Sequence, residues 1–270
     1  MPCASIDGIT IAYDDVGTGA GTLLLVHGHP FNRTMWRPQL EFMGGAGWRV
    51  IAPDLRGYGE STVVPGTTTL DVFARDLAGL LDYLGLPEVV IGGLSMGGQI
   101  VMEFARQYPE RVRGILLAAT FPQAETDEGK RNRRTMADRL LRDGMDAYAH
   151  DVLPRMLAAR SIAEMPDVAA HVLAMMRGTD PRGAAAALRG RAERPPYADT
   201  LAALNVPALV VVGDEDAFTS RADAEHMQAL LHHAELIWLK GVGHLPNLES
   251  PDAFNAAIVQ LLLRAMVARE

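Results

Sequence analysis

The sequence is poor in cysteine, contains no long apolar run and has no excess of positive charge. Its one cysteine, Cys3, cannot form an intramolecular disulfide, which is typical of proteins in a reducing compartment. No apolar run approaches the ~20 residues of a membrane span, and the opening residues lack the basic and apolar parts of a secretory signal. A net charge of -8 argues against nucleic acid or an anionic membrane as the main partner. These absences predict a cytoplasmic protein.

Hydrophobic residues make up 49% of the sequence and charged residues 21%, the balance of an ordinary globular protein. Six apolar runs are too short for helices and lack polar alternation, so we predict strands that are covered on both faces. Amphipathic stretches alternate with several of these runs, which indicates a mostly parallel sheet with helices on both faces. The predicted strands comprise residues 23–26, 49–52, 89–91, 115–119, 208–212 and 236–239.

Two of the amphipathic stretches have clear helix boundaries. A helix over residues 70–84 has Thr69 as its expected cap and Gly85 as its end. Another helix starts at the pair Ser250 and Pro251, because serine is a good cap and proline suits a first helical turn.

Residues 121–204 break the alternation, because they contain no convincing strand and are divided by prolines. We predict several short helices inserted between two strands. An insertion after the carboxyl end of a strand lies above the crevice in which open α/β sheets bind ligands, so we interpret it as a lid. The core then comprises residues 1–120 and 205–270.

The pattern Gly-Leu-Ser-Met-Gly at residues 93–97 follows a predicted strand and precedes a helix predicted over residues 98–108. This is the context of a nucleophile elbow, a tight strand-to-helix turn that exposes its serine at the top of a sheet. The central residue of such a turn takes strained backbone angles, and small neighbours let the turn close. Ser95 is therefore the candidate nucleophile.

A serine hydroxyl needs a base, and an acid must orient that base. In the elbow architecture the acid and then the histidine follow the serine along the chain. His244 lies in a glycine-containing loop after the last predicted strand, so it is the candidate base. We interpret five other histidines as solvated or packed residues, namely His150, His171, His226, His232 and His233.

The acid is expected in the loop after the preceding strand, where Asp214, Glu215 and Asp216 compete for the role. Asp216 lies further into the loop and is favoured. Asp214 is the second candidate, and its alternative role is to bond the backbone of the turn. Asp223 forms a capping box with Ser220 and is interpreted as structural.

Stabilisation of an oxyanion needs backbone N–H donors. One belongs to Met96, the residue after the nucleophile, and the loop after an early strand supplies the other, for which His29 is the candidate. The side chain of His29 either faces the substrate or bonds nearby backbone. The candidates for the wall of the substrate pocket, with core packing as the alternative, are Phe31, Trp36, Met175 and Met176.

A basic run opens the inserted segment with Lys130, Arg131, Arg133 and Arg134. We interpret it as a solvated helix face, because no aromatic residues are interleaved as nucleic-acid binding would favour. The sequence shows no Cys/His spacing typical of a metal site and no phosphate-binding pattern. No cofactor or metal is predicted.

The chain resembles the α/β-hydrolase family over most of its length. Residues 23–28 and 52–61, the elbow and the loops of Asp216 and His244 carry the resemblance, which implies the fold and supports Asp216 as the acid. Residues 93–98 are similar to cofactor-free esterases, non-haem haloperoxidase-like hydrolases and enol-lactonases. Many relatives have proline four residues after the acid, where this chain has Ser220, so the path of the acid loop stays open.

These residues predict a serine hydrolase that cleaves a small carboxylic ester or lactone through an acyl-enzyme intermediate. One alternative is a carbon–carbon bond hydrolase or a specialised biosynthetic enzyme with the same three residues. Relatives of the ring-fission type usually have asparagine where this chain has Leu94, which counts against them. Another alternative is a weakly catalytic ligand receptor.

Overall fold

A computed structural model describes residues 2–19 and 21–267 of the protein. One eight-stranded sheet has the order β1-β2-β4-β3-β5-β6-β7-β8. The pairs β1–β2 and β2–β4 are antiparallel and the other pairs are parallel, as the predicted fold class requires. The strands are β1 (Cys3–Ile6), β2 (Ile9–Val16), β3 (Thr22–Val26), β4 (Arg49–Pro53), β5 (Val89–Leu94), β6 (Val112–Ala118), β7 (Ala208–Gly213) and β8 (Ala234–Leu239).

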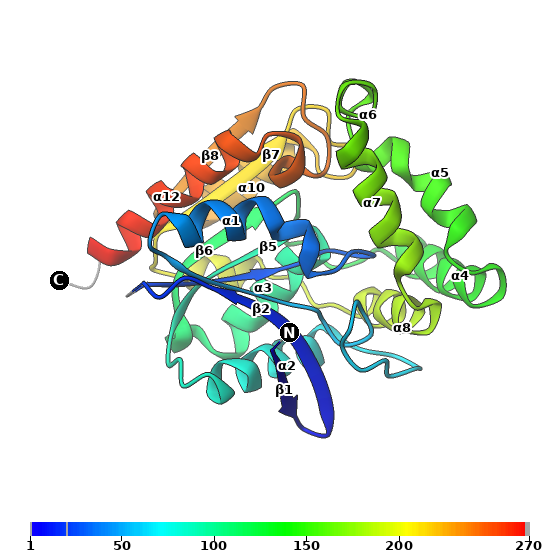
Figure 1. Cartoon of the computed structure of the whole chain (residues 1–270), viewed down its shortest axis with the longest axis horizontal. Helices are drawn as coiled ribbons and strands as arrows, with labels where there is room; N and C mark the ends of the chain where they lie inside the picture. Colours follow the sequence, from blue (N-terminus) through cyan, green and yellow to red (C-terminus); the bar gives the residue numbers. More distant parts are fainter. Residues whose placement is uncertain (1, 20, 268–270) are drawn as a thin grey trace.

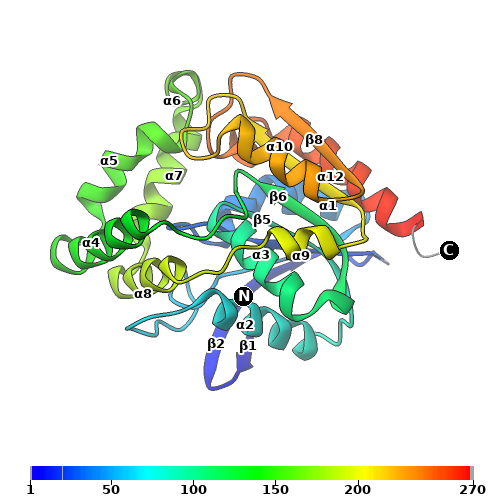
Figure 2. The same ribbon diagram turned by 180° about the vertical axis from the view of Figure 1, so that it is seen from behind.

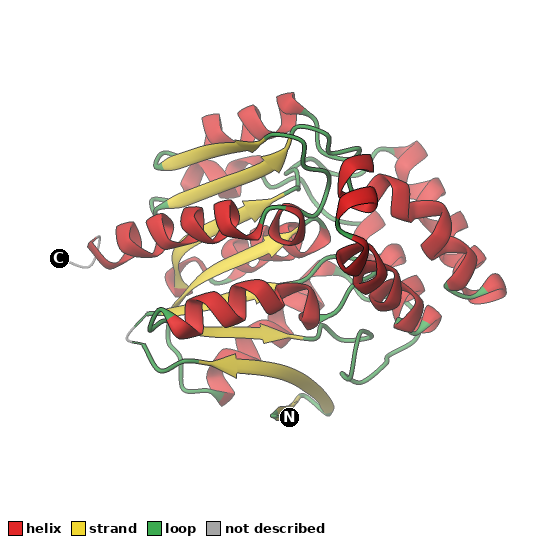
Figure 3. Cartoon of the chain, turned by 45° about the horizontal axis from the view of Figure 1, so that its top comes forward, coloured by secondary structure: helices red, strands yellow, loops and turns green. Residues whose placement is uncertain are grey.

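Helices cover both faces of the sheet (Figure 3). Leu24 and Val26 of β3 pack toward one face, whereas Leu23 and Leu25 pack toward the other, which explains the unbroken apolar runs. One face carries α1 (Arg37–Gly45), α11 (Pro246–Glu249) and α12 (Pro251–Val267), and the other carries α2 (Leu70–Tyr83), α3 (Met96–Gln107), α9 (Ala198–Ala203) and α10 (Arg221–Leu230). Two short 3-10 helices, η1 (Arg33–Trp36) and η2 (Pro109–Arg111), lie in connections.

The N-terminal hairpin of β1 and β2 is missing from the sequence prediction. Ala4 and Ile6 are buried while Cys3 and Ser5 are exposed, so β1 alternates as a half-exposed strand does. Asp-Gly at residues 7–8 forms the turn with φ angles of 46° and 82°. An Asp-Gly pair between alternating runs is a strong hairpin signal, and it was available in the sequence.

The predicted helix boundaries lie close to the observed ones, but not every predicted cap forms its hydrogen bond. α2 begins after Thr69, but the Thr69 side chain makes no capping hydrogen bond. Gly85 follows the end of this helix with a φ of 66°, as a helix-terminating glycine should. Ser220 and Asp223 form the complete capping box that was predicted for α10.

Helices also fill the connection between β6 and β7. All but the last of them lie beyond the carboxyl ends of the parallel strands, at the right in Figure 1 and at the left in Figure 2. The Thr68 amide donates to the Ala186 carbonyl of one of them at 3.0 Å, which ties it to the core. α9, from the same connection, packs on α3 and α10. The other helices are α4 (Asp127–Asp143), α5 (Asp146–Met156), α6 (Ala159–Glu164), α7 (Pro166–Gly178) and α8 (Pro181–Ala192).

None of the helices within residues 2–19 and 21–267 is both long enough and apolar enough to cross a membrane.

A buried ion pair joins two loops at the carboxyl edge of the sheet. Asp54 is fully buried, pairs with the guanidinium of Arg33 and accepts the amides of Arg33 at 2.7 Å and Glu60 at 2.8 Å. Burial alone lowers the pKa of Arg33, but the carboxylates of Asp54, Glu60 and Asp14 raise it overall. This pair therefore fixes the loop that follows β3, which carries His29.

Replacing Arg33 with methionine leaves the Asp54 carboxylate buried without its partner. We expect the Arg33→Met variant to lose about 3–5 kcal/mol of the free energy of unfolding, measured by urea denaturation. Arg182→Met is the control, because its ion pair with Asp180 is solvent-exposed and its loss should leave the urea midpoint unchanged. Equal midpoints for the two variants would show that the buried pair does not stabilise the loops.

Candidate active site

Ser95 forms the whole turn between β5 and α3. The strand ends at Leu94 and the helix begins at Met96, two residues before its predicted start. Ser95 has φ 57° and ψ -116°, a conformation that costs a non-glycine residue about 1–3 kcal/mol. Next to it, a Cβ atom on Gly97 would lie 2.2 Å from the carbonyl oxygen of Val26, so only glycine lets the turn pack against β3. The structure thus contains the strained, tightly packed elbow that the sequence predicts.

Two unpaired backbone amides flank this serine. A Cβ atom on Gly28 would lie 2.9 Å from the Leu94 carbonyl oxygen and 3.4 Å from the Ser95 Cβ, so the loop of His29 runs beside the elbow. Within the described ranges, the amides of His29 and Met96 donate no hydrogen bond. The Met96 amide also lies at the N-terminus of α3, where the helix dipole is positive.

His244 and Asp216 form a buried hydrogen-bonded pair. The Nδ1 atom of the His244 ring lies 2.9 and 3.0 Å from the two carboxylate oxygens of Asp216. Burial raises the pKa of Asp216, but the charge and hydrogen bond of His244 and the amides of Phe218 and Thr219 lower it overall. Asp216 is therefore an ionised hydrogen-bond acceptor at neutral pH, and it holds a proton on Nδ1 of the ring.

Asp214, the second candidate for the acid, has the alternative role predicted for it, a bond to the backbone of the turn. The Asp214 carboxylate is exposed and accepts the Gly241 amide at 2.6 Å, which closes the turn before His244.

Ser95, His244 and His29 line one cavity of about 470 Å³ at the carboxyl ends of the strands. Helices α4, α5 and α8 form the opposite wall. Among the described residues, no hydrogen bond joins the Ser95 hydroxyl to the His244 ring. Bonds of this kind are often long without substrate and tighten when it binds. The cavity thus brings together Ser95 and His244, which are 149 positions apart in the chain.

Four predicted pocket residues do not line this cavity. Phe31, Trp36, Met175 and Met176 are buried in the core layer that also contains α12. The centroids of the Trp36 and Phe254 rings, for example, lie 6.2 Å apart. Large apolar side chains gain more free energy from full burial than from lining a cavity. The apolar and aromatic lining comes instead from Phe121, Met136, Tyr148, Val152, Met156, Leu188 and Phe218.

The basic run of α4 is more than a solvated face. Lys130 and Arg134 do pair with Glu193 at the surface. Arg133, in contrast, lines the cavity and pairs with Glu125, so the interpretation fails for this residue. Arg133 lies at helical spacing from Gly129 and Met136, on the face of α4 that lines the cavity, which a count of charges along the sequence does not reveal.

Glu249 is a structural residue of the site that the sequence analysis missed. Its buried carboxylate accepts the amides of Gly243 at 3.0 Å and Leu245 at 3.1 Å, on either side of His244. It also accepts the amide of Ala158 at 2.9 Å and the hydroxyl of Ser161 at 2.7 Å, from the inserted segment. One carboxylate thereby joins the His244 loop to the inserted helices.

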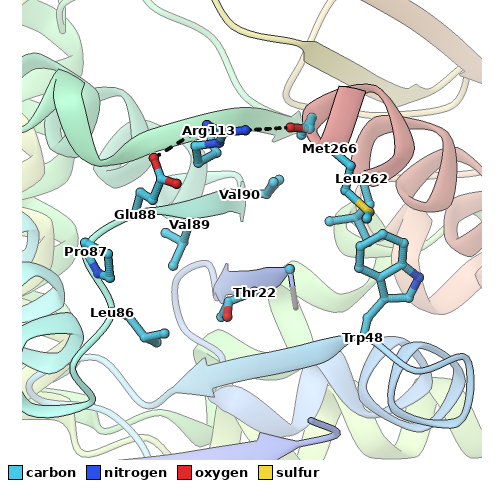
Figure 4. A pocket seen from close by; sticks show the side chains of 12 residues that line it. Thr22, Trp48, Leu86, Pro87, Glu88, Val89, Val90, Arg113, Leu262 and Met266 are labelled. Carbon is cyan, nitrogen blue, oxygen red and sulfur yellow. Dashed lines mark hydrogen bonds and ion pairs between the residues drawn. The ribbon is translucent and has the colours of Figure 1, made fainter. Parts of the chain in front are cut away.

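A second cavity lies at the opposite edge of the sheet, near the start of β3 and β5 (Figure 4). Its volume is about 200 Å³, and Trp48, Val90 and Leu262 supply apolar walls. Its charged lining residues are Glu88 and Arg113, and a carboxylate oxygen of Glu88 lies 3.7 Å from a guanidinium nitrogen of Arg113. Ser95, His244 and Asp216 are not among the described residues that line this cavity.

No group of three or more His, Cys, Asp or Glu side chains within the described ranges is arranged to hold a metal ion.

A mostly parallel sheet with a serine elbow at its carboxyl edge, followed by a paired aspartate and histidine, defines the class of the α/β hydrolases. The chain belongs to the Alpha/beta hydrolase family, whose sequence profile matches residues 23–257.

Solved structures and curated relatives show which members it resembles. A thermophilic esterase from Thermogutta terrifontis, solved with malate bound, is 39% identical with a TM-score of 0.95, covering 98% of this chain and 99% of that chain. The enol-lactonase from Burkholderia xenovorans LB400 is 27% identical with a TM-score of 0.89, covering 97% and 100%. A 3-oxoadipate enol-lactonase from Acinetobacter baylyi is 27% identical over 86% of this chain and 85% of its own length.

The hydrogen bonds of Glu249 generate a prediction about the His244 loop. Glu249→Gln puts an amide group against N–H donors, so we expect a loss of about 1–3 kcal/mol in the free energy of unfolding. Urea denaturation measures the change. Asp214→Asn is the matched control on the same loop, and its exposed hydrogen bond should cost less than about 1 kcal/mol. A larger loss in the control than in Glu249→Gln would contradict the assignment.

The lowered pKa of Asp216 predicts a pH dependence of stability. The carboxyl group binds fewer protons in the folded chain than in the unfolded chain, so its contribution is complete above the ordinary aspartate pKa of about 3.9. That contribution is lost as the pH falls through the lowered pKa. The difference in free energy of unfolding between the wild type and Asp216→Asn should therefore shrink below about pH 4. Urea denaturation at several pH values tests this, and a difference independent of pH would refute it.

Proposed function

We propose that this protein is a serine hydrolase that cleaves a small carboxylic ester or lactone through an acyl-enzyme intermediate. The observation that carries the proposal is the His244–Asp216 pair, which shares one cavity with a serine held at positive φ. The similarity to an esterase and to enol-lactonases supports the same class of substrate. The single cysteine is consistent with action in the cytoplasm.

In the proposed reaction, the Nε2 atom of His244 takes the hydroxyl proton of Ser95 as the oxygen attacks the substrate carbonyl. The oxyanion accepts hydrogen bonds from the amides of His29 and Met96, and each such bond typically contributes about 2.7–4 kcal/mol to stabilisation of the transition state. The Asp216 carboxylate stabilises the imidazolium that forms. His244 then gives its proton to the leaving alkoxide, which departs as the alcohol.

The second half of the reaction uses the same groups. His244 removes a proton from a water molecule, and the resulting hydroxide attacks the acyl carbon of the ester formed with Ser95. The proton returns to the Ser95 oxygen as the carboxylic acid is released. The same steps open a lactone, whose alcohol stays attached to the acid.

We also propose that residues 121–204 act as a lid over a core of residues 1–120 and 205–270. α4, α5 and α8 supply one wall of the cavity, so they limit the size of the substrate and exclude water from the reacting carbonyl.

The nucleophile can be tested by covalent labelling. A fluorophosphonate should phosphonylate the Ser95 oxygen with loss of fluoride, and mass spectrometry should locate the adduct on that residue. We expect Ser95→Ala to abolish labelling and to lower kcat on a short p-nitrophenyl ester by about 10⁴-fold or more. Ser220→Ala, outside the cavity, is the control and should be labelled as wild type. An active, labelled Ser95→Ala variant would rule out the proposed nucleophile.

The orienting acid can be tested in the same assay. Asp216→Asn keeps the shape of the side chain but no longer holds a proton on Nδ1 of His244, so Nε2 cannot act as the base. We expect kcat to fall by about 10⁴-fold. The Asp214→Asn variant should retain most of the activity, because Asp214 does not contact His244. The reverse ranking of these two variants would identify Asp214 as the acid.

A further inference from the structure

The cavity of Ser95 is basic although the protein is acidic. Its lining contains the side chains of four arginines, and Asp151 is the one acidic residue among the lining residues. The whole chain has a net charge of -8. Clefts lined by one sign of charge concentrate the field and attract ligands of the opposite sign. The four arginines are Arg133, Arg139, Arg155 and Arg191.

Two of these arginines pair with a carboxylate, and a third is exposed to solvent. Arg139 lies 2.7 Å from the carboxylate of Asp151, and Arg133 pairs with Glu125. Arg155 is exposed and lies 4.2 Å above the ring of Phe218. These contacts give each of the three charges a local counterpart.

Arg191 differs because no carboxylate of the residues that the structure describes pairs with it. It is half-buried at the end of α8, and its Nε atom donates to the neutral side-chain oxygen of Gln99 at 2.7 Å. Within residues 2–19 and 21–267, the two terminal nitrogens of Arg191 make no hydrogen bond or ion pair. A guanidinium carries five donors, so most of its capacity is unused.

The neighbours of Arg191 make its positive charge less favourable. Glu125 is the nearby acid, but Arg133 and Arg194 already share it, the latter at 2.9 Å. Burial lowers the pKa of Arg191 and the charges of Arg133 and Arg194 lower it further. Three guanidinium groups thus face one carboxylate. A partly buried charge of this kind is stabilised when a ligand of opposite charge pairs with it.

His29 provides a second unpaired polar atom beside the same cavity. Its Nδ1 atom lies 2.8 Å from the hydroxyl of Tyr58, and its buried Nε2 atom has no partner among the described residues. Burial and the charge of Arg191 both lower the pKa of His29, so the ring stays neutral. His29 and Arg191 both line the cavity, and each has at least one side-chain nitrogen without a partner among the described residues.

We propose that the substrate carries a carboxylate separate from the ester or lactone that is cleaved, and that the terminal nitrogens of Arg191 bind this carboxylate. The inference rests on the proposed hydrolase function. A carboxylate accepts two parallel N–H bonds from one guanidinium, which supplies the charge that the protein leaves unmatched. α8 is tied to the core through Ala186 and Thr68, so Arg191 is positioned before the substrate arrives.

Matched substrates test the proposal directly. Monoethyl adipate and ethyl hexanoate differ by a carboxylate in place of a methyl group at the far end of the acyl chain. We expect kcat/KM to favour the charged member by about 10- to 100-fold, the effect of a hydrogen bond to a charged group. Monoethyl succinate and glutarate, each with its methyl-ended analogue, extend the series to other separations between the carboxylate and the ester.

The Arg191→Gln variant should remove this preference and bring the ratio of kcat/KM values close to one. Arg191→Lys, which retains a charge but not the planar fork, should keep part of it. Arg139→Gln is the matched control within the same cavity, because Arg139 is already paired, and it should keep the wild-type ratio. Thermal unfolding verifies that each variant is folded.

Binding separates this inference from the proposed function. Titration calorimetry with sodium adipate should show binding to wild type and Ser95→Ala, and at least about 10-fold weaker binding to Arg191→Gln. If adipate does not bind to the wild type, or binds equally well to Arg191→Gln, the carboxylate site is overturned. It is also overturned if the wild type shows no kcat/KM preference for the charged ester at any chain length. Adipate binding that depends on Arg191 in a protein that fluorophosphonate does not label would support the site and reject the hydrolase.

Discussion

The site depends on the one-residue turn at Ser95. A strand and a helix can meet there only because Ser95 accepts a positive φ and because Gly97 lets the helix start contact β3. Packing on both faces of the sheet stabilises β5 and α3, and this packing offsets the local strain. The turn therefore places the serine, the start of a helix and the loop after β3 at one point.

Buried carboxylates hold the loops around that point. Asp54 fixes the loop after β3, Glu249 fixes both sides of His244, and Asp216 bonds the His244 ring. Each has several donors, as a buried negative charge requires. Arg191 breaks this pattern, because its charge pairs with no carboxylate in the part of the chain that the structure describes. The difference separates the groups that build the fold from Arg191, the group that we propose binds the substrate carboxylate.

The sequence predicted the core better than the walls of the cavity. Runs such as 208–212 and the pattern at 93–97 are local, so strands and elbow could be recognised. The turn at residues 7–8 was also local and was overlooked. The positions of Arg133 and Trp36 could not be predicted, because they depend on how the inserted helices and α12 pack. Glu249 was missed for the same reason.

The sequence by itself determined the order of strands and helices along the chain, the residue types available for chemistry and the strained turn, because these follow from spacing and from the conformational limits of single residues. Only the tertiary structure showed that Asp216, which the sequence favoured over Asp214, meets His244, and that Arg191 lines the cavity with no carboxylate partner among the described residues. Pairing between distant side chains is set by the packing of whole elements, which no local pattern encodes.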